Sequence, residues 1–171
     1  MQTQTPRSVL TTARIVHFAM LTSVGIYFAV VFFAVRPLPE SLGPGLPTLD
    51  PFAIALAAVA LVDLVLAWVL PGILSGEERL KAAMLGTGGD RLAVALALAL
   101  QGFIIRLALL EAVAIVGLVL AFVRQDPRLF YPFAVVSAAA MLVARFDRAK
   151  VLEVYSRLAL ERGWSQLPLE G

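Results

Sequence analysis

The sequence predicts an all-α integral membrane protein, a four-helix bundle of four transmembrane spans with a C-terminal cytoplasmic amphipathic helix. Three observations support this fold class. Hydrophobic residues make up 60% of the 171 residues and charged residues only 15%, whereas soluble domains have roughly 45–50% and about 25%. The mean hydropathy is +0.89. Four segments are also apolar over about 20 residues, the length of helix that crosses a bilayer core.

The predicted spans form a single transmembrane domain, 1–171, and charged residues or prolines end them. Their ranges are 15–35, 52–70, 103–123 and 129–146. The first is too long for the apolar region of a signal peptide, which has about 7–15 residues, and no A-x-A cleavage site follows it. We expect Pro71 and Gly72 to stop the second span, because proline breaks the helix ladder.

The distribution of lysine and arginine predicts the orientation. With both termini in the cytoplasm, ten basic residues lie on that side and three outside. The ten are Arg7, Arg14, Arg79, Lys81, Arg91, Arg145, Arg148, Lys150, Arg157 and Arg162, and the three are Arg36, Arg124 and Arg128. This positive-inside bias predicts a multi-pass protein of the bacterial inner (cytoplasmic) membrane with N- and C-termini in the cytoplasm.

The connections between spans differ in character. Segment 36–51 contains five prolines and is expected to form a stiff outer cap. Segment 72–91 has a short helical piece around 77–85, followed by a glycine-rich run. Segment 92–102 is apolar but too short to span, so it either extends the third helix or lies at the interface, with a bend at Gln101 and Gly102.

Segment 147–164 is predicted to be an amphipathic helix on the cytoplasmic side. Its apolar face is formed by Val151, Leu152, Tyr155, Leu158 and Ala159. One interpretation places this helix on the membrane or under its own bundle, with Trp164 as an anchor at the headgroups. The other makes it the docking helix for a partner subunit.

The residues give no indication of an enzyme. There is no cysteine and one histidine, which leaves no thiol chemistry and no predicted metal site. No phosphate-binding glycine motif, nucleophile elbow or nucleophile–base set is present. The 14 Lys and Arg nearly balance the 12 Asp and Glu, so no nucleic-acid partner is expected. Any cofactor is unknown, because apolar cofactors need no motif.

Four ionisable side chains fall within the predicted spans: His17, Asp63, Arg106 and Glu111. A charge at the bilayer centre costs roughly 2.5–3.5 kcal/mol on insertion scales, so each is a candidate functional residue. Asp63 lies 11 residues from Phe52, and Glu111 lies 11 residues from Phe122. At about 1.5 Å per residue, both carboxylates are about 16 Å from the outer ends of their spans, near the midplane.

The two carboxylates have three interpretations. They bind or relay a proton or cation, they form hydrogen bonds that specify helix packing, or they contact another protein. Short acidic side chains cannot reach the headgroups from this depth. If Asp63 and Glu111 face one another, they could share a proton, because two adjacent negative charges repel.

Arg106 and His17 lie nearer the cytoplasmic ends of their spans. Arg106 either extends to the headgroups or pairs with an acid. It is about 140° around the helix from Glu111, so that pairing would require another helix or protomer. His17 is expected at a helix–helix or membrane interface, with a proton relay as the alternative.

The stretch RLALLEAVAIVGLVLAF (106–122) resembles the carboxylate-bearing helix of the proteolipid c subunits, which form the rotor ring of rotary ATPases. The resemblance is limited to residues 103–123. It implies that Glu111 is the ion-carrying carboxylate and that Ala112, Ala114 and Gly117 permit tight helix packing. Residues 60–68 weakly repeat this pattern around Asp63.

We therefore expect a non-enzymatic small polytopic subunit of an inner-membrane energy-transducing assembly, with Glu111 and Asp63 binding a proton or cation. The alternative is an accessory or scaffolding subunit whose buried acids only specify helix packing and assembly. Besides the lipid bilayer, we expect copies of this chain or other membrane subunits as partners, in the second case through 147–164. Small residues allow the close helix approach that such association needs. These are Ala93, Ala95, Ala97, Ala99 and Ala138–Ala140.

Overall fold

The computed structural model describes residues 6–35, 51–86 and 91–163, and every regular element in these ranges is a helix. The helices are α1 (Pro6–Ala34), α2 (Pro51–Leu74), α3 (Glu77–Gly86), α4 (Arg91–Arg124), the 3-10 turn η2 (Pro127–Leu129), α5 (Phe130–Val143) and α6 (Arg148–Arg162). Four helical stretches are long and apolar enough to cross a membrane. The all-α class and the four candidate spans are therefore confirmed.

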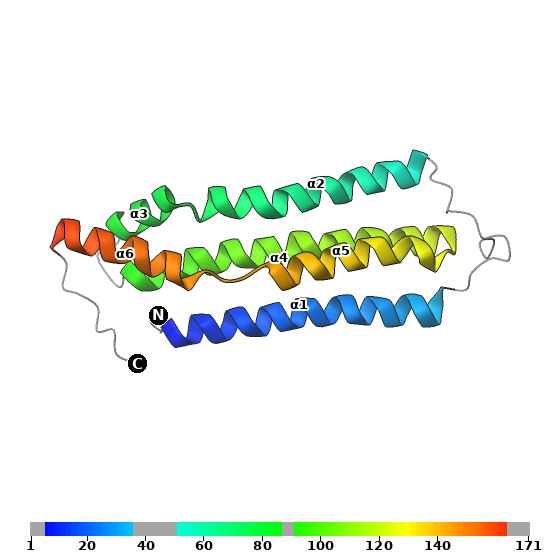
Figure 1. Ribbon diagram of the computed structural model, residues 1–171, viewed down its shortest axis with the longest axis horizontal. Coiled ribbons are helices and arrows are strands. Elements are labelled where there is room, and N and C mark those ends of the chain that lie inside the picture. Colours follow the sequence, from blue (N-terminus) through cyan, green and yellow to red (C-terminus); the bar gives the residue numbers. More distant parts are fainter. Residues whose placement is uncertain (1–5, 36–50, 87–90, 164–171) are drawn as a thin grey trace.

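Helix α4 is the centre of the fold. It contacts α1, α2, α3, α5 and α6, and in Figure 1 α1 and α2 lie on opposite sides of the α4/α5 pair. Buried alanines recur every seven residues along α2, at Ala53, Ala60 and Ala67, and allow α2 to approach α4 closely. Because α1 and α2 each use one side for packing, their other sides expose large apolar side chains such as Phe18, Phe32 and Leu61.

Helix α4 has 34 residues and is about 51 Å long, well beyond the roughly 30 Å of a hydrocarbon core. Residues 92–102 are continuous with 103–123 in this one helix, which is not interrupted at Gln101 and Gly102, where we expected a bend. This segment is therefore an extension of the third span. It lies beside α3 and α6, which continue the chain beyond α2 and α5 (Figure 1).

At this end of the molecule, α3, α6 and the first turns of α4 share a hydrophobic core. Fully or almost fully buried side chains come from all three helices. They include Leu80 and Met84 of α3, Leu92 and Leu96 of α4, and Val151, Val154 and Leu158 of α6. The same cluster continues into the α1–α4–α5 contact. The tail helix thus packs under its own bundle, whereas Trp164 lies outside the described residues.

Helix α2 does not stop before Pro71 as expected, but continues through it to Leu74. Ser75 follows the last residue of the helix, and its backbone N–H and hydroxyl both donate to the Pro71 carbonyl, at 2.9 and 2.7 Å. Conversely, α5 ends at Val143, before the predicted boundary at 146. Residues 144–147, which begin with the extended Ala144, separate it from α6, and Asp147 caps α6 through the Lys150 N–H.

The opposite end of the molecule has a compact turn between α4 and α5. Gln125 adopts a left-handed conformation with φ of 50°, and the Asp126 carboxylate caps η2 and pairs with Arg128 at 3.1 Å. A small apolar cluster of Ala53, Leu120 and Leu129 joins α2 to this turn. The proline-rich segment expected to form the outer cap, 36–51, lies outside the described residues except for Pro51.

Candidate functional site

Glu111 projects from α4 towards α1, where it meets two hydroxyl groups. Tyr27 donates a hydrogen bond from Oη to Glu111 Oε1 at 2.8 Å, and the Ser23 hydroxyl bonds to the same oxygen. Ser23 and Tyr27 are four residues apart on α1, so they lie on one face of that helix. All three side chains are partly buried. The result is a polar cluster between two predominantly apolar helices.

The Ser23 hydroxyl lies within hydrogen-bond distance of two oxygens. One is Glu111 Oε1 and the other is the Met20 carbonyl, at 2.7 Å. A hydroxyl has one proton to donate but can also accept. If Glu111 is ionised, Ser23 donates to the carboxylate; if Glu111 is protonated, its O–H donates to Ser23, which then donates to Met20. The same heavy-atom positions therefore accommodate Glu111 with and without a proton.

Asp63 lies on α2 and is partly buried. Ala67 on α2 is opposite Arg106 on α4, and the two helices run in opposite directions. Asp63 lies four residues from Ala67, and Leu110 lies four residues from Arg106 in the same direction along the bundle. Asp63 is therefore level with Leu110 and close in height to Glu111. The bonds of Glu111, however, go to α1. Within the described ranges, no hydrogen bond or ion pair joins the two acids, so no direct contact supports a shared proton.

Arg106 forms a contact that the sequence analysis did not include. Its Nε donates to the Ala67 carbonyl at 3.1 Å, and its guanidinium carbon lies 5.0 Å from the centre of the Trp68 ring. Pro71 is four residues after Ala67 and has no N–H, so the usual helical donor to the Ala67 carbonyl is missing. Arg106 supplies that donor. In the part of the chain that the structure describes, it forms no ion pair with Asp63 or Glu111.

His17 lies on α1 against the ring of Phe103, with ring centres 5.8 Å apart and planes inclined by 57°. Phe103 also packs against Phe146 at 5.8 Å. His17 is thus a residue of the α1–α4 contact. Across residues 6–35, 51–86 and 91–163, no hydrogen bond connects it to Glu111 or Asp63, and the relay hypothesis gains no geometric support.

The sequence analysis missed Ser23, Tyr27 and Ser137. Ser137 is fully buried on α5 and donates to the Leu110 carbonyl at 2.7 Å, next to Glu111 in the chain. The signal that could have found the first two was their spacing, because two hydroxyl residues four apart in an apolar helix share a face. Their helix partner could not be found from spacing alone.

Among the described residues, no group of three or more His, Asp or Glu side chains could hold a metal ion. No family model, curated protein or solved structure matches the chain. The functional argument therefore depends on the geometry around Glu111 and on the apolar helices that surround it.

Proposed function

We propose that this chain is a non-enzymatic, four-span subunit of a bacterial inner-membrane energy-transducing assembly, in which Glu111 binds and releases a proton within the bilayer. The observation that carries this proposal is the pair of hydroxyl groups, from Ser23 and Tyr27, on one oxygen of the Glu111 carboxylate. The second oxygen, Oε2, accepts no hydrogen bond from the described residues, so the proton can be carried by Oε2 as well as by Oε1.

The position of Glu111 along α4 supports a role inside the membrane. Glu111 is 11 residues from Phe122 and nine from Gly102, where α2 and α5 are both close to their ends. These separations correspond to about 16 and about 14 Å along α4, which together match a hydrocarbon core about 30 Å thick. An acid at this height either stays neutral or is stabilised by donors, and the Ser23–Tyr27 pair allows both.

The chemistry of the cluster favours a proton over a metal cation. Hard cations such as Ca²⁺ need about 6–8 oxygen ligands, whereas a proton needs one. Around Glu111 the described oxygens are the carboxylate, two hydroxyls and the Met20 carbonyl, and one hydroxyl already bonds to that carbonyl. Asp63 is a second titratable acid at similar height, and we assign it no part in the Glu111 cluster.

The proposal includes the orientation of the chain in the membrane. The end of the molecule with α3 and α6 is cytoplasmic, α6 is the cytoplasmic amphipathic helix, and both termini lie on that side. Basic residues support this orientation, since Arg79, Arg145 and Lys150 belong to that end and Arg124 and Arg128 to the other. The apolar outer faces of α1 and α2 contact lipid or other subunits, including copies of this chain.

Labelling with dicyclohexylcarbodiimide, which reacts with protonated carboxyl groups in apolar surroundings, tests the proposal. In the purified protein we expect modification of Glu111 that decreases as the pH is raised. The Glu111→Gln variant should lose that modified peptide, and Asp63→Asn is the matched control that should retain it. Absence of Glu111 modification throughout the pH range would contradict proton binding.

The alternative is a scaffolding subunit, and one observation favours it as well. The bonds from Ser23 and Tyr27 to Glu111 connect α1 to α4, so they also specify helix packing. Glu111→Gln separates the two functions, because glutamine retains an acceptor oxygen but binds no proton at ordinary pH. Preserved assembly and preserved cellular function in this variant would favour scaffolding. Neither hypothesis requires membership in the proteolipid c-subunit family.

A further inference from the structure

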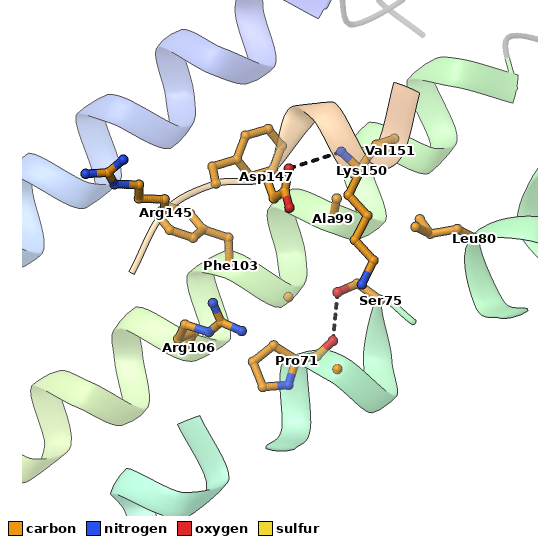
Figure 2. Close-up of a pocket in the computed structure, with 13 residues that line it drawn as sticks. Pro71, Ser75, Leu80, Ala99, Phe103, Arg106, Arg145, Asp147, Lys150 and Val151 are labelled. Atoms are coloured by element: carbon orange, nitrogen blue, oxygen red, sulfur yellow. Dashed lines mark hydrogen bonds between the residues drawn. The ribbon is translucent and has the colours of Figure 1, made fainter. Parts of the chain in front are cut away.

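Two helix interruptions meet at the same height beside α4. One is the end of α2 at Pro71 and Ser75, and the other is the junction between α5 and α6 at residues 144–147. Between them lies a cavity of about 190 Å³, shown in Figure 2. Gly102 forms part of its wall, and a Cβ there would lie 2.7 Å from Ser75 Oγ, so glycine permits this close approach.

The cavity is positively charged. Its lining includes the basic residues Arg106, Arg145 and Lys150 and a single acid, Asp147. In Figure 2 the Arg145 guanidinium points away from the other two cations, so Arg106 and Lys150 are the cations that face the cavity. The Asp147 carboxylate already accepts the Lys150 backbone N–H at 3.0 Å. In the described parts of the chain, no ion pair involves any of the three cations.

Arg106 is the most enclosed of these cations and points into the cavity in Figure 2. Its Nε bonds to the Ala67 carbonyl, whereas its terminal nitrogens have no hydrogen-bond partner among the described residues. Glu77 is the nearby acid outside the cavity, and it is already bonded to Lys81, which lowers the pKa of Glu77. Lys150 of the cavity acts on Glu77 only through a weaker electrostatic attraction, and no ion pair joins the two within the described residues.

We propose that this cavity binds a phosphate group. The planar guanidinium of Arg106 offers two parallel N–H donors, which match the oxygens of a phosphate, and Lys150 adds a point charge. The cavity also adjoins the first turn of α6, a helix of 15 residues whose N-terminal N–H groups favour an anion. The apolar side of the cavity, with Phe103 and Phe146, suits the first methylene groups of lipid acyl chains.

The position of the cavity gives two sources for the phosphate. Gly102 is about 14 Å along α4 from Glu111, which places the cavity where hydrocarbon meets headgroups. Basic pockets between helices on the cytoplasmic side are a recurring mode of binding anionic lipid headgroups. A soluble phosphate compound entering from the cytoplasm has the same chemistry. This inference is independent of proton binding by Glu111.

The lipid arm of the test uses the full chain in nanodiscs of phosphatidylcholine containing about one fifth phosphatidylglycerol. After extraction into detergent, native mass spectrometry measures how much phosphatidylglycerol stays bound. We expect Arg106→Gln and Lys150→Gln to lower this occupancy at least fivefold. The matched control, Arg157→Gln, removes an exposed cation of α6 outside the cavity and should leave the occupancy unchanged.

The second arm titrates lipid-depleted protein in neutral detergent with inorganic phosphate and follows binding by calorimetry. Binding in this arm alone, lost in Lys150→Gln, would identify a soluble phosphate as the ligand. Because Arg106 also supports α2, the exposed Lys150 provides the variant that should fold normally. Equal lipid and phosphate binding by wild type, Lys150→Gln and Arg157→Gln would overturn the proposal.

Discussion

Arg106 on α4 donates to the Ala67 carbonyl on α2, the carbonyl that Pro71 leaves without its helical donor. A free carbonyl in hydrocarbon costs free energy, and helices that contain proline in membranes need another donor for it. The cation is also placed over Trp68, which adds a favourable interaction with the ring. Arg106 and Pro71 thus form one structural unit, although they lie on different helices.

A double-mutant cycle tests this relationship. Arg106→Met alone should destabilise the protein by about 1–3 kcal/mol, because the Ala67 carbonyl loses its donor. In a Pro71→Ala background, residue 71 supplies its own N–H, and the same arginine substitution should cost about 1 kcal/mol less. The measurement is reversible unfolding in mixed micelles. Strictly additive effects of the two substitutions would contradict the coupling.

The Tyr27 hydroxyl provides a prediction about the Glu111 cluster. Tyr27→Phe removes one donor to Glu111 Oε1 and leaves the Ser23 hydroxyl in place. Donors to a carboxylate stabilise its ionised form, so carbodiimide labelling of Glu111 should persist to higher pH in this variant. Tyr131→Phe, an exposed tyrosine on α5, is the control and should leave the labelling profile unchanged. Identical profiles for Tyr27→Phe and wild type would refute the role of this hydrogen bond.

Two glycines, one at a close helix contact and one in open space, provide a matched test of helix packing. At Gly117 an added Cβ would lie 2.6 Å from the Cβ of Phe133, whereas at Gly25 nothing lies within 4 Å. We expect Gly117→Ala to destabilise the α4–α5 contact by about 1–3 kcal/mol, as overpacking does. Gly25→Ala should be neutral or stabilising by up to about 1 kcal/mol, because alanine favours helix. The check is the unfolding free energy in detergent, and equal effects at both positions would show that α4 and α5 are not closely packed there.

The sequence was sufficient for the features that depend on regular helix geometry. The four candidate spans follow from apolar length, and the similar height of Asp63 and Glu111 follows from a fixed rise per residue. Spacing along one helix does not determine which neighbouring helix a side chain meets. For that reason the contact of Glu111 with Ser23 and Tyr27 was not predicted. The end of α2 was misplaced for a related reason, since the donor that compensates for Pro71 belongs to another helix.

The final prediction concerns α6, whose two faces differ sharply in exposure. Leu158 is 4% exposed and packs in the core shared with α3 and α4, whereas Leu160, two residues on, is 73% exposed. Leu158→Ala should lower the free energy that holds α6 in place by about 2–5 kcal/mol, because the cavity left behind is filled only in part. The helix should then be released from the core. Limited trypsin digestion should then cut at Arg157 much faster than in wild type, and Leu160→Ala should digest at the wild-type rate. If a partner subunit held α6 instead, trypsin would digest the isolated wild-type protein rapidly, and Leu158→Ala would not change the rate. The packing of α6 against α3 and α4 of its own chain argues against that outcome.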